Sequence, residues 1–210
     1  MSDVKIGIYG GTFAPVHIGH IRSAYAFLSA CNLDRLFIMP TNVTPRKTHC
    51  PGDDPKTRLH MLNIAFSSLP FYNDKVLISD YEIRNPGISY TYKTLEHFKF
   101  ISNDLTLLCG TDNFLTLEKW KNFERIFELA KIAHIVRPGK QADMLTIQRM
   151  KEHYINSYRA TIIDVPMAPI DISSTELREM IKNNIDTSMY IPRDVRTFID
   201  NYNVYGEQDV

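Results

Sequence analysis

Two glycines and two histidines lie close together near the start of the chain. Gly10 and Gly11 directly follow a short run of β-forming residues, and His17 and His20 lie three residues apart where a helical pattern begins. The glycines let the backbone approach phosphate oxygens, and each imidazole can donate a hydrogen bond to a phosphoryl oxygen. We also expect unpaired N–H groups and a positive dipole end at the start of this helix. The segment therefore indicates a triphosphate site.

A second group of candidate residues lies about 150 residues further along the chain. Ser173 and Glu176 have the spacing of a capping box, which explains both residues without any ligand. Arg178, one turn into the same predicted helix, can pair with phosphate oxygens. If both segments bind one ligand, they have to converge at the carboxyl ends of the strands.

The elements that position these residues alternate along the chain. Short β-rich runs predict strands at residues 5–9, 35–39, 75–79, 105–109, 133–136 and 161–165. Helical patterns lie at about residues 18–30, from residue 55 onward, at 91–100 and at 123–130. Because parallel strands need crossover connections, this alternation predicts an α/β fold: a Rossmann-like, doubly wound parallel sheet with helices on both faces.

Two regions interrupt or follow this alternation. Residues 40–54 form a polar, proline-containing loop, after which Asp54 and Pro55 predict the start of a helix. Its expected apolar side carries Leu59, Leu62, Ile64 and Ala65. Helices at 173–183 and 192–202 have no strand between them, which predicts a small C-terminal helical subregion at about 170–210 within one domain of residues 1–210.

Composition excludes several classes of function. The 24 basic and 24 acidic residues cancel, so no long-range positive field favours a nucleic acid or a membrane as partner. The three cysteines are odd in number and lack zinc-ligand spacing, which argues against a disulfide framework or a structural metal. The chain begins without the apolar stretch of a signal peptide or membrane span, and we expect it in the cytoplasm.

The segment from Gly10 to His20 resembles the nucleotidylyltransferase superfamily, whose hallmark is a glycine turn followed by HxGH, and within it the nicotinate mononucleotide adenylyltransferases. Its spacing fits neither the GxGxxG nor the Walker pattern. The resemblance implies that Gly10, Gly11, Thr12 and Phe13 contact ATP. This chain has Ala14 where the family usually has an acidic or amide residue.

Two further segments resemble phosphate-binding parts of the family. Residues 172–178 are similar to its second signature, which implies that Ile172, Ser173 and Ser174 bind ATP beside Arg178. Residues 44–47 are similar to a proline-rich loop that ends in a basic residue, although arginine stands at 46 where histidine is more usual. This likeness implies a phosphate contact for Lys47 and an acceptor contact for Thr44.

The remaining likenesses concern the second substrate. Residues 89–91 resemble the family's SYT element, which implies acceptor contacts for Tyr90 and Thr91. Gly110 and Asp112 follow a predicted buried strand and resemble the GxD element, which implies ATP contacts. Trp120 is the only tryptophan, and the resemblance implies that its indole stacks on a pyridine ring. From the residues alone, the aspartate could equally cap a helix and the tryptophan could fill the core.

Together these likenesses imply adenylyl transfer from ATP to nicotinate mononucleotide, with ATP and that mononucleotide as the small-molecule partners. The catalytic residues would be His17, His20, Lys47 and Arg178, and Mg²⁺ would be held largely by ATP oxygens and water. Two alternatives stay open. One is another adenylyl- or cytidylyltransferase of the same fold, with an acceptor such as nicotinamide mononucleotide or phosphopantetheine, and the other is a nucleotide-binding sensor without catalysis. The sequence also leaves assembly into a homo-oligomer open.

Overall fold

The computed structural model describes residues 3–43, 54–67, 69, 72–135, 144–168, 170 and 172–206. Six parallel strands form one sheet in the order β3-β2-β1-β4-β5-β6. The strands are β1 (Ile6–Gly11), β2 (Arg35–Pro40), β3 (Val76–Ile78), β4 (Leu105–Gly110), β5 (Lys131–Ile135) and β6 (Ile162–Val165). The order reverses between β1 and β4, which is where ligands bind in open parallel sheets. The predicted doubly wound α/β fold is confirmed.

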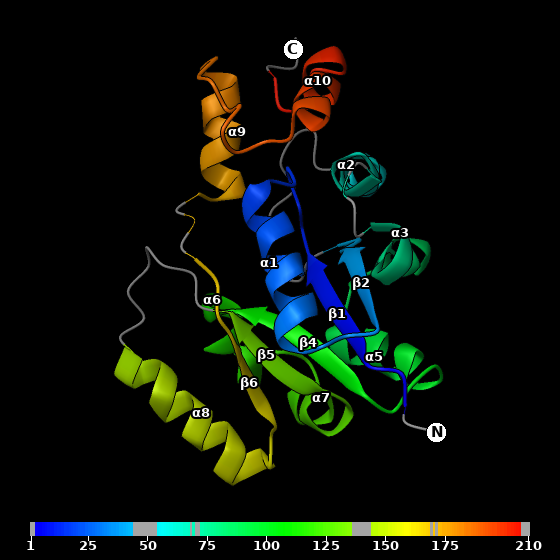
Figure 1. Ribbon diagram of the computed structural model, residues 1–210, viewed down its shortest axis with the longest axis vertical. Helices are drawn as coiled ribbons and strands as arrows, with labels where there is room; N and C mark the ends of the chain where they lie inside the picture. The colour runs from blue at the N-terminus through cyan, green and yellow to red at the C-terminus, as the bar shows by residue number, and fades with distance from the viewer. Residues whose placement is uncertain are drawn as a thin grey trace.

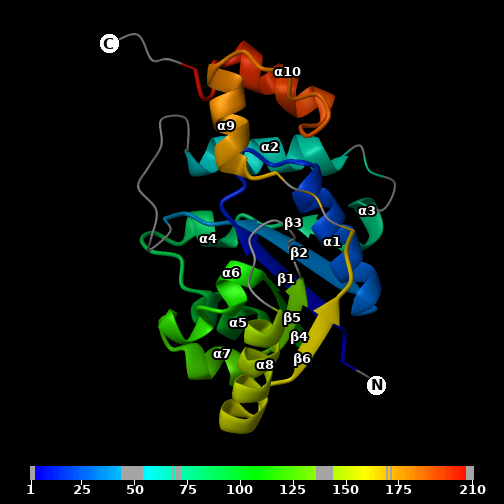
Figure 2. The same ribbon diagram turned by 90° about the vertical axis from the view of Figure 1, so that its left-hand side faces the viewer.

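Side chains alternate between the two faces of the sheet and form two buried clusters. On β1, Ile6 and Ile8 belong to one cluster and Tyr9 to the other. On β2, Phe37 packs against the cluster of Ile6 and Ile8, and Leu36 belongs to the cluster of Tyr9. Helices cover both faces of the sheet because the apolar side chains of each cluster have to be shielded from water. Figure 2 shows α1 on one side of the sheet and α5, α7 and α8 on the other.

The helices occupy most of the connections between strands. They are α1 (Ile18–Ala30), α2 (Pro55–Ser67), α3 (Tyr72–Lys75), α4 (Tyr81–Arg84), α5 (Thr91–Lys99), α6 (Thr111–Phe114), the 3₁₀-helix η1 (Leu117–Lys119), α7 (Phe123–Leu129), α8 (Met144–Tyr158), α9 (Ser174–Lys182) and α10 (Arg193–Asn201). The last two lie beyond the carboxyl end of β1, with α9 above the start of α1 and α10 near α2 (Figure 1).

The structure differs from the sequence-based expectation in two helices. On α2 the buried residues are Arg58, Met61, Leu62, Ala65 and Phe66, so the inward stripe begins at an arginine, while Leu59 and Ile64 are only half-buried. Helix α8 was not predicted from the sequence, and the residues that it buries are Ile147 and Tyr154.

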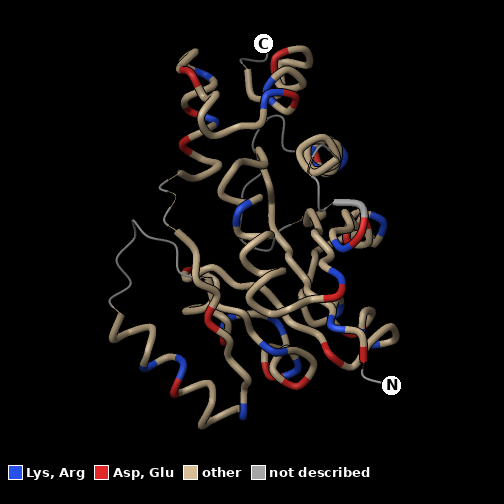
Figure 3. The backbone as a smooth tube through the Cα atoms, viewed as in Figure 1, with Lys and Arg blue, Asp and Glu red and all other residues tan. Residues whose placement is uncertain are grey.

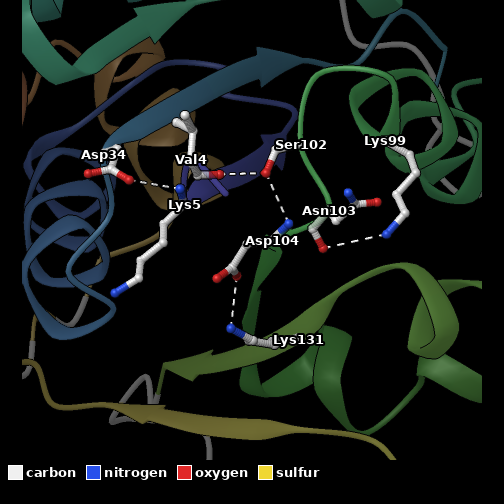
Figure 4. A network of polar contacts seen from close by, with 8 residues as sticks. All are labelled: Val4, Lys5, Asp34, Lys99, Ser102, Asn103, Asp104 and Lys131. Atoms are coloured by element: carbon white, nitrogen blue, oxygen red, sulfur yellow. Dashed lines mark hydrogen bonds and ion pairs between the residues drawn. The ribbon is translucent and has the colours of Figure 1, made fainter. Parts of the chain in front are cut away.

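A polar network ties the strands together at the edge opposite the carboxyl ends, as Figure 4 shows. The Lys5 N–H donates to the Asp34 carboxylate at 2.8 Å, and the Ser102 hydroxyl donates to the Val4 carbonyl. Lys131 Nζ lies 2.8 Å from Asp104 Oδ1, and the Ile6 N–H donates to the Asp104 carbonyl. These contacts fix the amino ends of β1, β2, β4 and β5 relative to one another.

Charged residues are distributed over the outer helices. Figure 3 shows Lys and Arg interspersed with Asp and Glu rather than gathered on one face. Among the residues that the structure describes, no helix has the length and apolar character needed to cross a bilayer.

Candidate active site

Strand β1 ends in two glycines, Gly10 and Gly11, which differ in their surroundings. Phe13 adopts a φ of 54°, and its buried ring lies edge-on to His20 with 4.9 Å between centroids. A Cβ atom on Gly11 would lie 2.9 Å from the Phe13 ring, so only glycine permits this approach. A Cβ on Gly10 would meet no atom within 4 Å. The backbone at Gly10 therefore borders open space that a ligand can occupy.

The two histidines form a reciprocal cap at the start of α1. His17 Nδ1 accepts the Gly19 N–H at 3.1 Å, and His20 Nδ1 accepts the His17 N–H at 3.3 Å. Both side chains are more than nine-tenths buried, and their ring centroids are 3.8 Å apart. Because each Nδ1 accepts a hydrogen bond, each neutral ring carries its proton on Nε2. The cap thus makes both Nε2 atoms donors.

Gly19, between the histidines, is required by the same geometry. A Cβ at this position would lie 2.8 Å from His17 Cε1 and 2.9 Å from its Nδ1. Any larger residue would therefore displace the imidazole from its cap. This geometry explains why the third residue of the HxGH motif is glycine.

The expectation of unpaired N–H groups at the start of α1 is wrong. The Ile18 N–H donates to the Tyr190 carbonyl at 2.8 Å, and the Gly19 N–H donates to His17 Nδ1. The His20 and Ile21 N–H groups both reach the His17 carbonyl. The histidine cap and the C-terminal loop occupy the donors that a bare helix end would present to an anion.

The start of α9 lies directly against the turn after β1, as the proposed convergence requires. Ser174 Oγ donates to the Pro15 carbonyl at 3.0 Å, and Arg178 Nη1 donates to the Ala14 carbonyl at 2.7 Å. The Ala14 side chain is 2% exposed and belongs to the core. At this position the carbonyl, rather than a side chain, makes the polar contact that joins the two segments.

Ser173 caps α9 as the capping-box spacing predicts. Its Oγ accepts the Glu176 N–H at 3.2 Å, and the Glu176 carboxylate accepts both the N–H and the hydroxyl of Ser173. Ile172 is half-buried against the core beside this cap. Among the described residues, the hydrogen bonds of the helix cap thus account for a serine at position 173 without any ligand.

The remaining predicted ATP contacts lie at the carboxyl end of β4. Gly110 ends this strand and precedes α6, and Asp112 is exposed in the first turn of that helix. Thr111 lies 3.3 Å from Nε2 of the buried His134. Trp120 is half-buried and packs against the cluster that α5 and α7 cover.

Tyr90 and Thr91 lie at the start of α5, near the carboxyl end of β2. The Ser89 N–H donates to the Val43 carbonyl at 3.0 Å, and the Asn42 N–H donates to Ser89 Oγ at 2.9 Å. This joins residues 89–91 to the end of β2. Thr44 and Lys47, the other predicted contacts near this strand end, lie outside the described residues.

The sequence analysis missed Arg58, which lies at the base of the site and is 2% exposed. Nη1 donates to the Thr12 carbonyl at 2.9 Å, and Nη2 donates to the Thr41 carbonyl at 2.6 Å and the Asn42 carbonyl at 3.2 Å. Its place on the inward stripe of α2 is the signal that could have found it, because a charged residue there needs buried partners.

A buried carboxyl group lies near this guanidinium. Glu82 Oε1 accepts the Thr94 hydroxyl at 2.7 Å, and the side chain is 8% exposed. Burial raises the pKa of the Glu82 carboxyl above its ordinary value, although hydrogen bonds from Thr94 and Ser89 and the charge of Arg58 oppose the rise. The sequence patterns did not predict a buried carboxyl group close to Ser89.

The donor set around the HxGH turn consists of imidazoles, a guanidinium and backbone groups. Within the part of the chain that the structure describes, no three His, Cys, Asp or Glu side chains cluster as metal ligands. Such a set suits phosphate oxygens and does not suit a cation held by protein carboxylates.

Comparison with known proteins agrees with this site. A family model described as cytidylyltransferase-like matches residues 8–180, which include both the HxGH turn and the start of α9. A Clostridium tetani protein with the name "Probable nicotinate-nucleotide adenylyltransferase" is 36% identical over 96% of this chain and 98% of its own length. A protein of the same name from Clostridium novyi is 35% identical over 96% of this chain and 98% of its own length.

Solved structures share the fold. The Plasmodium falciparum nicotinic acid mononucleotide adenylyltransferase in complex with NaAD is 20% identical, with a TM-score of 0.76 over 96% of this chain and 97% of that chain. The same enzyme in complex with APC is 19% identical, with a TM-score of 0.74 and the same coverage. The chain therefore belongs to the cytidylyltransferase-like family and, within it, to the nicotinate-nucleotide adenylyltransferases.

Proposed function

We propose that this chain transfers the adenylyl group of ATP to the phosphate of nicotinate mononucleotide, giving nicotinate adenine dinucleotide and pyrophosphate in a step of NAD synthesis. The observation that carries the proposal is the contact of the HxGH turn with the start of α9 through Ser174 and Arg178. The names of the relatives at 34–36% identity support the choice of acceptor.

The reaction replaces one bond to phosphorus with another. An oxygen of the acceptor phosphate attacks the α-phosphorus of ATP, the bond from that phosphorus to the bridging oxygen breaks, and its electron pair leaves with pyrophosphate. Such a transfer needs alignment and stabilisation of charge more than covalent help from the protein. In this proposal His17 and His20 donate from Nε2 to phosphate oxygens, and Arg178 adds positive charge from α9.

The other predicted contacts divide between the two substrates. The backbone of Gly10, Gly11, Thr12 and Phe13 approaches the triphosphate, while Gly110 and Asp112 contact the nucleoside and Ile172, Ser173 and Ser174 border the phosphates. What supports this is their common place at the carboxyl ends of β1 and β4 and the start of α9. Lys47 is proposed to contact phosphate on the basis of its motif alone.

For the acceptor we propose contacts from Thr44, Tyr90 and Thr91 and stacking of the pyridine ring on Trp120. The half-burial of Trp120 leaves part of its indole accessible, which supports stacking. Mg²⁺ would enter with ATP, held by triphosphate oxygens and water, and would offset negative charge on the phosphates. The donor set of the described site supports that assignment because it offers imidazoles and a guanidinium.

The proposal is tested by measuring pyrophosphate release from ATP with separate acceptors. We expect the highest kcat/KM with nicotinate mononucleotide, compared with nicotinamide mononucleotide and phosphopantetheine. A higher value with either competitor would assign a different acceptor. Binding of ATP without pyrophosphate release for any acceptor would favour the sensor function instead.

His20→Ala tests the role of the imidazoles. We expect kcat to fall about 10²- to 10³-fold, the range found when one donor to a developing charge is removed. Loss of this buried ring and of its hydrogen bond should lower the free energy of unfolding by about 1–3 kcal/mol. The matched control is His60→Ala, since His60 is exposed on α2 and packs on Phe198. A folded His20→Ala enzyme with wild-type kcat would refute the assigned role.

A further inference from the structure

A buried guanidinium connects the two halves of the proposed site. Arg58 on α2 donates to the carbonyl of Thr12, in the turn after β1, at 2.9 Å. It also donates to the carbonyls of Thr41 and Asn42, which follow β2, at 2.6 and 3.2 Å. Arg58 therefore joins the carboxyl ends of two neighbouring strands, each of which leads to a different substrate.

The connection continues from β2 to the acceptor segment. The Asn42 N–H donates to Ser89 Oγ at 2.9 Å, and the Ser89 N–H donates back to the Val43 carbonyl at 3.0 Å. Val43 and Ile88 also form a parallel bridge. Because Ser89 immediately precedes Tyr90, a path of direct hydrogen bonds runs from the ATP turn to the proposed acceptor contacts.

Glu82 anchors the far end of this path. Its Oε1 accepts the Thr94 hydroxyl from α5 at 2.7 Å, and Ser89 lies close enough to lower the pKa of the same carboxyl group. The charge of Arg58 acts on the same carboxyl group. Arg58 thus contacts the end of β2, and Glu82 contacts Thr94 in α5.

We propose that Arg58 and Glu82 are positioning residues that fix the placement of the ATP turn relative to the acceptor segment 89–91. The inference rests on the proposed function. Arg58 is 2% exposed and Glu82 8%, so their effect passes through the backbone and Ser89 rather than through contact with substrate. Alignment of the attacking oxygen with the α-phosphorus depends on this placement, and a misplacement of about 1 Å can reduce a rate about 100-fold.

Arg58→Lys is the first test. A lysine keeps the charge, but its compact ammonium cannot reproduce the planar fork that reaches carbonyls of both strand ends. We expect kcat to fall about 10- to 100-fold, while the Kd for ATP measured alone stays within about threefold of wild type. The matched control is Arg125→Lys, since Arg125 pairs with Glu96 and Glu128 on the surface and should leave kcat unchanged.

A loss of folded protein would give a different pattern, because the number of ATP sites per chain would fall in parallel with activity. If Arg58→Lys does not fold, Ser89→Ala and Thr94→Val test the positioning inference instead. Each variant removes one hydroxyl from the path and keeps the side chains of Arg58 and Glu82. They should show the same fall in kcat with little change in ATP affinity. Wild-type kcat in a folded Arg58→Lys, or in both hydroxyl variants, would overturn the inference.

Amide hydrogen exchange tests the inference without any turnover. In Arg58→Lys, or in Ser89→Ala if the first variant does not fold, we expect the Asn42 and Ser89 amides to exchange at least about tenfold faster than in wild type. The Leu107 and Ile132 amides of β4 and β5 should be unchanged. Unchanged exchange at Asn42 and Ser89 would refute the path. If wild type releases no pyrophosphate with nicotinate mononucleotide, the proposed function fails, while the exchange result still decides the positioning inference.

Discussion

The Nδ1 atoms of His17 and His20 cap α1, so each neutral ring carries its proton on Nε2, the atom that is proposed to donate to phosphate. The cap holds each ring in one tautomer before a ligand arrives, so less reorganisation is needed when charge develops. The HxGH pattern was readable from the sequence, but the use of Nδ1 in capping was not, because capping depends on the dihedral angles of the turn. For the same reason the sequence could not show that the N–H groups of α1 are already partnered.

Gly19→Ala tests whether the position of the His17 ring matters for the reaction. A Cβ at residue 19 would lie 2.8 Å from His17 Cε1, so the ring has to move. We expect kcat to fall at least about tenfold, because a displaced donor no longer meets the developing charge. Ser29→Ala, an exposed change in the same helix, is the control. Pre-steady-state measurement of adenylyl transfer checks the result, and an unchanged rate would contradict it.

At the level of elements, strong local patterns were predicted well and weak ones were missed. All six predicted strands are present, because each has a short β-rich run, and α1 begins and ends where its periodicity does. The fifth strand starts at Lys131, before the predicted residue 133, since neighbouring strands set its pairing. Helix α8 was not predicted. On α2 the expected Leu62 and Ala65 are buried, but the inward side also includes Arg58, whose guanidinium donates to backbone carbonyls.

The contact between β5 and α6 should make stability depend on pH. Burial lowers the pKa of His134 below its ordinary value, the charge of Lys151 lowers it further, and Asp164 opposes the shift. With its folded pKa depressed, neutral His134 contributes stability above its unfolded pKa of about 6.5, and that stability is lost as pH falls through the lower folded value. We expect the free energy of unfolding to fall as the pH drops below about 6.5.

Comparison with His134→Gln isolates this effect from the titration of other groups. A glutamine cannot gain a proton in this range, so the wild type should lose more stability than the variant as pH falls. Urea denaturation at several pH values measures the difference. Parallel curves for the two proteins would show that His134 does not titrate in this way.

On the scale of the whole molecule, we propose that residues 1–210 form one domain. What supports this is that Val195 and Ile199 of α10 and Leu177 of α9 lie in the same buried cluster as Val16, next to the HxGH histidines. The C-terminal helices thus share a core with the sheet instead of forming one of their own. Sequence alone gave two helices without a strand between them, and it could not say against which surface they pack.

Ile199→Ala tests the single-domain proposal. Removing this buried side chain should lower the free energy of unfolding by about 2–5 kcal/mol. Trp120, the only tryptophan, lies in the other buried cluster, so its fluorescence reports the far side of the sheet. In one domain the fluorescence and far-UV circular dichroism transitions shift together. A circular dichroism shift with unchanged Trp120 fluorescence would indicate two units, and Met189→Ala, at an exposed position, is the control.

The bond from the Ile18 N–H to the Tyr190 carbonyl also bears on how the protein is made. The HxGH turn is synthesised well before Ser174, Arg178 and Tyr190, which contact it. A nascent or prematurely terminated chain that ends before Arg178 therefore carries the histidines without the groups that hold their turn. Translation itself therefore delays completion of these contacts until Tyr190 has been synthesised.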